Sequence, residues 1–221
     1  MRSLFRTRTL FDGFMRPGDV RLAGELGADA VGFHFNHNSD HRMRVEAARS
    51  MRPAVTPLVG SVASFVDNTQ QEVREVIKQL RPNLVVFSGQ EEDAFCRAFG
   101  IPFLKTFTQG QIPPGLDGKQ LHAKFPSAAG FNFKAAALTG TASQSDWKWL
   151  PPDLTKPFLL SGGFKIEALF DVITALEPWG IVVCDEIETR PGFKDGELMR
   201  RVVFESRRAD CHEVQNACES N

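Results

Sequence analysis

Eight short apolar runs, each followed by a longer and more polar segment, constrain the fold of this chain more than any other feature. The runs are candidate strands at Thr7–Phe11, Ala30–Phe35, Leu58–Phe65, Leu84–Phe87, Phe103–Phe107, Ala128–Phe133, Phe158–Leu160 and Ile181–Cys184. Strands that alternate with helical segments are typical of parallel α/β sheets. Eight such units predict a single-domain α/β protein closed as a (β/α)8 TIM barrel.

The segments between the strands carry helix signals. Thr69 precedes a run with Val73, Val76 and Leu80 on one helical face, which predicts a helix over Thr69–Leu80. Pro17 stands where the first turn of another helix is expected. The other helices are expected at Asp19–Leu26, Val45–Met51, Glu91–Phe99, Ser145–Leu150, Lys165–Leu176 and Asp195–Glu205.

Two segments depart from this regular pattern. Residues Thr108–Gln120 contain three glycines and two prolines, so we expect the fifth helix to be reduced to a loop. Residues 206–221 are polar and show no periodicity, which predicts a frayed tail after a barrel over residues 1–205.

Charge and composition exclude several classes of protein. The net charge of −1 lacks the basic excess of a nucleic-acid-binding domain, and no apolar run is long enough to span a membrane. The first residues do not form a secretory signal, and the four cysteines show no disulfide-type spacing. We therefore expect a reduced, cytoplasmic protein, a monomer or homodimer, that binds a small molecule and neither nucleic acid nor a membrane.

Polar residues at the ends of the predicted strands mark the candidate site, because ligands of such barrels bind at the carboxyl ends of the strands. His34 alternates with Ala30 and Gly32, on the opposite face from Val31 and Phe33. Since the bulky face of a barrel strand packs against helices, His34 is predicted to point into the barrel mouth.

Short motifs along the chain carry a family resemblance. They are Arg16-Pro17-x-Asp19, Gly27–Phe33, Phe65-Val66, Asp146-Trp147, Lys156-Pro157-Phe158, Ser161-Gly162-Gly163, Glu188 and Pro191-Gly192-x-Lys194-Asp195. In order and spacing they resemble phosphoribosylanthranilate isomerase, a (β/α)8 barrel of tryptophan biosynthesis. The resemblance implies an Amadori-type aldose–ketose isomerisation of an aminosugar, with a general base, a general acid and a phosphate cradle but no cofactor.

The catalytic positions differ from the family pattern. Asp12 stands where the family has a cysteine as general base, and a carboxylate can perform the same proton abstraction. Asn132 stands where the family has an aspartic general acid, but an amide does not supply a proton and instead hydrogen-bonds a substrate oxygen. The first hypothesis is therefore an isomerase-like enzyme in which Asp12 is the base and His34, His41 or Asp185 replaces the lost acid.

The binding positions are changed as well. Ser161-Gly162-Gly163 keeps one half of the family's phosphate cradle, while Cys184-Asp185-Glu186 replaces the Ser-Ser-Gly of the other half. Each carboxylate about 5 Å from a phosphate would cost roughly 3 kcal/mol at an effective dielectric near 20. His41 and Arg42 occupy the loop where the family presents an arginine to the anthranilate carboxylate, and Lys105 matches a family lysine.

Two alternatives stay open at this point. The loss of the acid, half of the cradle and the polar groups of the fourth strand at Val86–Gly89 together favours a silent or repurposed barrel that binds a ligand or a protein partner. A metal-assisted enzyme is the second alternative, because imidazole and carboxylates at Asp12, His34 and Asp185 or Glu186 are suitable ligands for a divalent metal.

Overall fold

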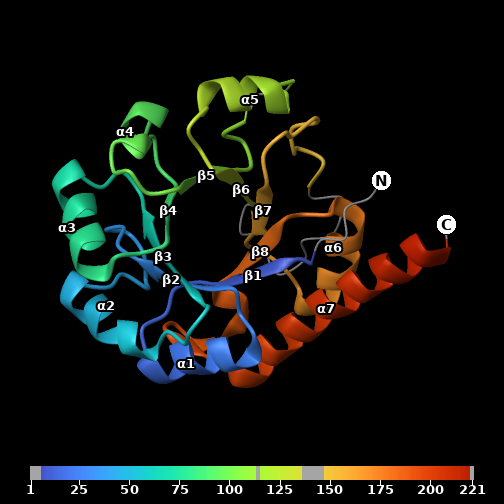
Figure 1. Ribbon diagram of the computed structural model, residues 1–221, viewed down its shortest axis with the longest axis horizontal. Helices are drawn as coiled ribbons and strands as arrows, with labels where there is room; N and C mark the ends of the chain where they lie inside the picture. Colours follow the sequence, from blue (N-terminus) through green and yellow to red (C-terminus); the bar gives the residue numbers. More distant parts are fainter. Residues whose placement is uncertain (1–5, 113–114, 136–146, 220–221) are drawn as a thin grey trace.

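Eight parallel strands close into a barrel in the computed structural model, which describes residues 6–112, 115–135 and 147–219 (Figure 1). The strands are β1 (Arg8–Phe11), β2 (Ala30–His34), β3 (Gly60–Phe65), β4 (Leu84–Phe87), β5 (Phe103–Thr108), β6 (Gly130–Lys134), β7 (Phe158–Ser161) and β8 (Gly180–Val183). Each strand pairs with its neighbour in sequence, and β1 pairs with β8. The predicted single-domain TIM barrel is confirmed, with strand ends within two residues of those expected.

The helices surround the barrel, as the ring of coiled ribbons in Figure 1 shows. They are α1 (Pro17–Leu26), α2 (Val45–Met51), α3 (Gln70–Leu80), α4 (Asp93–Arg97), α5 (Gly118–Lys124), α6 (Leu169–Leu176) and α7 (Gly196–Glu219). Short 3-10 turns are η1 (Arg52–Ala54), η3 (Ile166–Ala168) and η4 (Asp185–Ile187), and a hairpin pairs β9 (Glu188–Arg190) with β10 (Phe193–Lys194). The helix predicted from Thr69 is present as α3, and Thr69 caps it, since its hydroxyl accepts the Glu72 amide. None of the helices in the described part of the chain is both long and apolar enough to cross a membrane.

The fifth helix is present, so its predicted reduction to a loop is wrong. Helix α5 begins at Gly118, where Asp117 accepts the backbone N–H of Gln120 and the Gln120 side chain accepts the N–H of Asp117. Such a capping box satisfies the first amides of a helix. The glycines and prolines that suggested a loop mostly precede this cap.

Helix α7 continues to Glu219, where the sequence predicts a frayed tail from Ser206. Ser206 and Ala209 are buried, and the Asp210 carboxylate accepts hydrogen bonds from the amide and the hydroxyl of Thr7. Tertiary contacts therefore hold a segment that lacks an evident apolar stripe. The first two residues of the helix expected over Ser145–Leu150 belong to segment 136–146, which lies outside the described residues.

The core forms two layers. Inside the barrel, branched aliphatic side chains from six of the strands fill the centre, namely Leu10, Val62, Val86, Leu104, Leu159 and Val182. Outside it, a larger layer rich in phenylalanine lies between strands and helices. In that layer the rings of Phe35, Phe65 and Phe87 stack with centroids 5.8 and 5.7 Å apart. This packing holds the strand ends, and hence the site residues, in place.

Candidate active site

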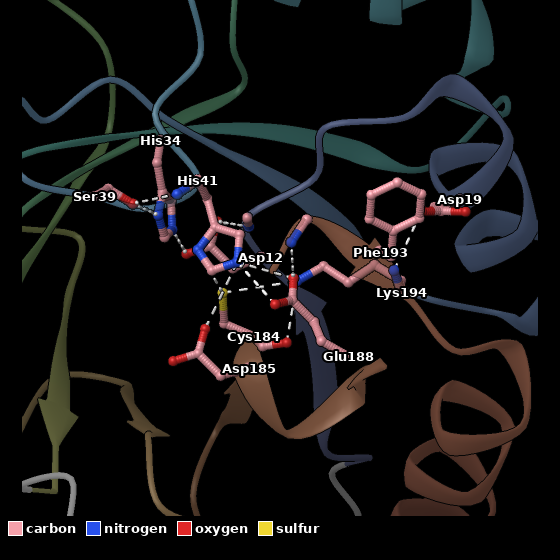
Figure 2. A network of polar contacts seen from close by, with 12 residues as sticks. Asp12, Asp19, His34, Ser39, His41, Cys184, Asp185, Glu188, Phe193 and Lys194 are labelled. Carbon is pink, nitrogen blue, oxygen red and sulfur yellow. Dashed lines mark hydrogen bonds and ion pairs between the residues drawn. The ribbon is translucent and has the colours of Figure 1, made fainter. Parts of the chain in front are cut away.

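Asp12 and His34 meet at the mouth of the barrel. Asp12 follows β1 and His34 ends β2, and the His34 Nε2 atom lies 2.9 Å from Asp12 Oδ2 (Figure 2). The Gly13 amide donates to Asp12 Oδ1 at 2.9 Å. Gly32, on the neighbouring strand, makes room for this pair, because a Cβ there would collide with the Asp12 carboxylate. His34 therefore points into the mouth, as the strand alternation predicts.

Ser39 fixes the other side of the His34 ring. Its hydroxyl lies 2.8 Å from His34 Nδ1 and also accepts the backbone N–H of His41 at 3.1 Å. An imidazole held at both nitrogens has little freedom to rotate. The result is a Ser39–His34–Asp12 chain of hydrogen bonds.

The environment of Asp12 lowers its pKa. Burial raises the pKa, but the charge and hydrogen bond of His34, the Gly13 amide and the charge of Lys194 together outweigh it. Asp12 is therefore a carboxylate at neutral pH. An ionised carboxylate beside an imidazole is an arrangement that accepts and returns protons.

A second cluster of polar side chains lies beside the first, around His41. His41 is 6% exposed, and its Nε2 atom lies 2.9 Å from both carboxylate oxygens of Glu188. Lys194 Nζ donates to Glu188 Oε1 at 2.8 Å and to the Cys184 carbonyl at 3.0 Å. Figure 2 shows Glu188 between His41 and Lys194, with Cys184 and Asp185 close to the imidazole.

The residues predicted to bind phosphate divide into two parts. Gly162 and Gly163 follow β7 with φ of +77° and +70°, and Ser161 is buried. At the end of β8, the Cys184 amide donates to the Glu186 carboxylate at 3.0 Å. The Glu186 carboxylate therefore accepts the hydrogen bond of the Cys184 N–H, which is then not available to a bound anion. The Asp185 side chain is 83% exposed.

Unpaired polar atoms line the inside of the mouth. Asn132 on β6 donates from its amide nitrogen to the Thr106 hydroxyl at 3.2 Å, but its buried Oδ1 has no hydrogen-bond partner among the described residues. Within the same described part of the chain, the buried Ser64 hydroxyl near the end of β3 also has no partner. Because buried polar atoms are costly when unpaired, these two groups are candidate contacts for a polar ligand.

Lys105 lies apart from Asp12 and His34. Its ammonium forms a buried ion pair with Glu91 at 2.8 Å and donates to the Gly89 carbonyl at 2.8 Å. Lys105, Glu91 and Gly89 line a cavity of about 640 Å³ between β4, β5 and the helices that follow these strands. Arg42, the other predicted cation, is exposed.

The structure thus brings Asp12 and His34 together, but it groups the other predicted residues differently. Asp185 lies 3.8 Å from His41 Nε2, and Glu186 contacts its own loop. Among the described residues, metal-ligand spacing is found for His41, Cys184 and Asp185 instead of the set expected from sequence.

Sequence reasoning gave no role to several polar residues of the site. They are Ser39, Ser64, Glu91, Glu188 and Lys194. Glu188 and Lys194 belong to the motifs that carry the family resemblance, which was the available signal. Glu188 also contacts His41, which is 147 residues away, and no local pattern indicates that contact.

Comparison with known proteins identifies the family. The family model for N-(5'phosphoribosyl)anthranilate (PRA) isomerase matches residues 11–205. The N-(5'-phosphoribosyl)anthranilate isomerase of Xanthomonas oryzae pv. oryzae (strain PXO99A) is 48% identical over 221 residues, covering 96% of this chain and 99% of the relative.

Solved structures agree with this match. Phosphoribosyl anthranilate isomerase from Thermus thermophilus aligns with a TM-score of 0.79 and 28% identity, covering 91% of this chain and 99% of that one. A phosphoribosyl anthranilate isomerase in complex with reduced 1-(O-carboxyphenylamino)-1-deoxyribulose 5-phosphate shares the fold, with a TM-score of 0.75 and 21% identity over 91% of this chain and 98% of that one. The barrel, its motifs and these matches establish that the chain belongs to the N-(5'-phosphoribosyl)anthranilate isomerase family.

Proposed function

We propose that this protein is an aldose–ketose isomerase that acts on an N-substituted aminosugar by an Amadori-type rearrangement. The observation that carries the proposal is the 2.9 Å contact between Asp12 and His34 at the barrel mouth. Family membership supplies the reaction class. The pair supplies a base and an acid at the strand ends where barrel enzymes bind their substrates.

The chemistry requires one proton to move from C2 of the sugar to the ring oxygen. A proton on His34 passes to the ring oxygen when the substrate takes the place of the Ser39 hydroxyl at Nδ1, so that the ring C–O bond breaks and the nitrogen lone pair forms an iminium. The Asp12 carboxylate then removes the C2 proton, which gives the enolamine that tautomerises to the ketose. Because His34 and Asp12 are hydrogen-bonded, the proton passes back to His34 and restores the pair.

The unpaired atoms of the mouth suit the sugar hydroxyls. Asn132 Oδ1 accepts a hydroxyl proton, and the Ser64 hydroxyl donates or accepts. Asn132 is then a binding residue at the position where the family has its acid. Arg42, an exposed cation in the loop that follows β2, is the partner we propose for a carboxylate on the N-substituent.

The 5-phosphate is the part of the family substrate that fits this chain least well. A relative binds a ligand that carries a 5-phosphate. In this chain the Cys184 amide is taken by Glu186, and Asp185 adds a second negative charge. We therefore propose weakened phosphate binding, with Ser161, Gly162 and Gly163 as the remaining half of the cradle.

We also propose a cytoplasmic monomer or homodimer with one barrel over residues 1–205. The free thiols of Cys96, Cys184 and Cys211 are consistent with a reducing compartment. Light scattering of the purified chain measures its oligomeric state.

The test of the proposed function is turnover of phosphoribosylanthranilate, measured as the loss of its fluorescence. The same assay is run with the compound that lacks the phosphate. Asp12→Asn is the matched variant, and Asp40→Asn, at an exposed position of the β2 loop, is the control. We expect Asp12→Asn to lower kcat by about 10²- to 10⁴-fold, as for loss of a general base. Absence of turnover above Asp12→Asn with both compounds would contradict the proposal.

A further inference from the structure

We propose that His41, Cys184 and Asp185 form a Zn²⁺ site with an open coordination position at the barrel mouth. Each residue offers one ligand atom, and the three atoms lie within 4.8 Å of one another. The Nδ1 atom of His41 and the Sγ atom of Cys184 are 3.9 Å apart. Figure 2 shows the three side chains converging from the β2 loop and the end of β8.

The distances are close to those that one zinc ion requires. With Zn–N and Zn–S bonds of about 2.0–2.3 Å, ligand atoms in a tetrahedral site lie about 3.3–3.6 Å apart. Nδ1 and Sγ need to approach by only a few tenths of an ångström. The exposed Asp185 side chain is free to turn toward them. Gly13 permits the close approach, because a Cβ there would lie 2.6 Å from Cys184 Sγ and 3.0 Å from the His41 ring.

Glu188 orients His41 for metal binding. Both of its carboxylate oxygens lie 2.9 Å from His41 Nε2, so this nitrogen carries the proton and donates it to Glu188. The lone pair is then on Nδ1, which faces Cys184. A carboxylate that holds the far nitrogen of a histidine ligand is a common feature of zinc sites.

The charges around the site favour a cation. Lys194 lies 3.7 Å from Cys184 Sγ, but its charge is matched by Glu188 at 2.8 Å. Asp185 and Glu186 then leave an excess of negative charge beside the thiol. Burial raises the pKa of the Cys184 thiol. A bound dication overcomes this by replacing the thiol proton, and it neutralises the thiolate and Asp185 together.

The donor set selects the kind of metal. Thiolate and imidazole favour zinc over the harder Mg²⁺ and Ca²⁺, which prefer oxygen ligands. Three protein ligands leave one position of a tetrahedron open, as in zinc sites that bind a substrate or water. The inference concerns metal binding alone, and it stands or fails independently of isomerase turnover.

The experiment uses the full chain purified without a histidine tag and stripped with a chelator. Zn²⁺ is titrated in competition with a chromophoric chelator, and Co²⁺ is titrated separately as a spectroscopic probe. We expect one metal ion per chain and a thiolate-to-cobalt charge-transfer band in the near ultraviolet. The band reports on the Cys184 ligand directly.

Variants assign the ligands. Cys184→Ser should remove the charge-transfer band, and Asp185→Asn and Glu188→Gln should each weaken Zn²⁺ binding by at least about 10-fold. Asp185→Asn tests the site even where Cys184→Ser fails to fold, because the Asp185 side chain is exposed. Cys211→Ser, at an exposed thiol of α7, is the matched control and should bind as the wild type does. Lack of stoichiometric binding, or an unchanged band in Cys184→Ser, would overturn the proposal.

Discussion

The Nε2 atom of His34 lies 2.9 Å from Oδ2 of Asp12, which joins the ends of β1 and β2 across the barrel mouth. The register of the two strands, with Phe11 opposite Val31, brings these ends side by side. Gly32 leaves the space that the carboxylate fills. The end of β1 thus carries a carboxylate with an imidazole partner on the neighbouring strand.

Ser39 is expected to act by positioning His34. Ser39→Ala removes the hydroxyl 2.8 Å from His34 Nδ1 and frees the ring to rotate. We expect kcat to fall by about 10-fold or more while KM changes little, because the residue holds the acid rather than the substrate. Steady-state kinetics measure kcat and KM separately, with Ser50→Ala, on the exposed face of α2, as the control variant. An equal rise in KM would indicate a binding role instead.

The lowered pKa of Asp12 predicts an acid-sensitive contribution to stability. Burial raises the pKa of Asp12, but the combined effect of His34, the Gly13 amide and Lys194 is larger and lowers it. The contribution is therefore present above the ordinary value of 3.8 and is lost as pH falls through the lower folded pKa. Urea unfolding between about pH 6 and about pH 3 should show this loss in the wild type. In Asp12→Asn the free energy of unfolding should depend less on pH. Parallel pH profiles for the wild type and the variant would contradict the lowered pKa of Asp12.

Glu186→Gly is expected to strengthen binding of inorganic phosphate. The substitution removes a carboxylate and frees the Cys184 amide, which Glu186 now occupies at 3.0 Å. We expect binding tighter by about 10-fold, measured by calorimetry. Stability should fall by about 1 kcal/mol, since a hydrogen bond is lost and glycine is flexible. Glu186→Gln removes the negative charge but keeps an oxygen that can accept the Cys184 N–H. This variant therefore separates charge repulsion of phosphate from the loss of the Cys184 donor.

The Lys105–Glu91 pair is expected to stabilise the fold. Lys105→Met leaves the Glu91 carboxylate buried without its cation at 2.8 Å. Breaking such a pair costs about 3–5 kcal/mol. Chemical denaturation should show this loss, and the double variant with Glu91→Gln should recover part of it. A loss below about 1 kcal/mol would argue that solvent reaches the carboxylate.

Asp210 is expected to fasten α7 to the start of β1. Asp210→Ala removes the acceptor of the Thr7 amide at 2.9 Å and of the Thr7 hydroxyl at 2.8 Å. We expect stability to fall by about 1–3 kcal/mol in urea unfolding, because a partly buried amide loses its partner. Asp40→Ala, at an exposed loop position, should change stability by less than about 0.5 kcal/mol.

Much of the fold was predictable because its signals are local. Each apolar run became a strand of four to six residues in the barrel, and the alternation around His34 placed its side chain in the mouth. Helix α5 has a local signal as well, the Asp117 cap, but the glycines and prolines that precede it are typical of a loop. The part of α7 that follows Glu205 was not predictable, because it lacks an evident apolar stripe and Ser206 and Ala209 become buried only in the folded protein.

The sequence by itself therefore determined the barrel, the order of its strands and the residues available at their ends. Only the tertiary structure decided which of them pair. His41 and Glu188 are 147 residues apart, Lys105 turns to Glu91, and Glu186 folds back on the Cys184 amide. Strand and helix periodicity depends on neighbours a few residues away, whereas these contacts arise when barrel closure brings separate strand ends together and burial forces each charge to find a partner.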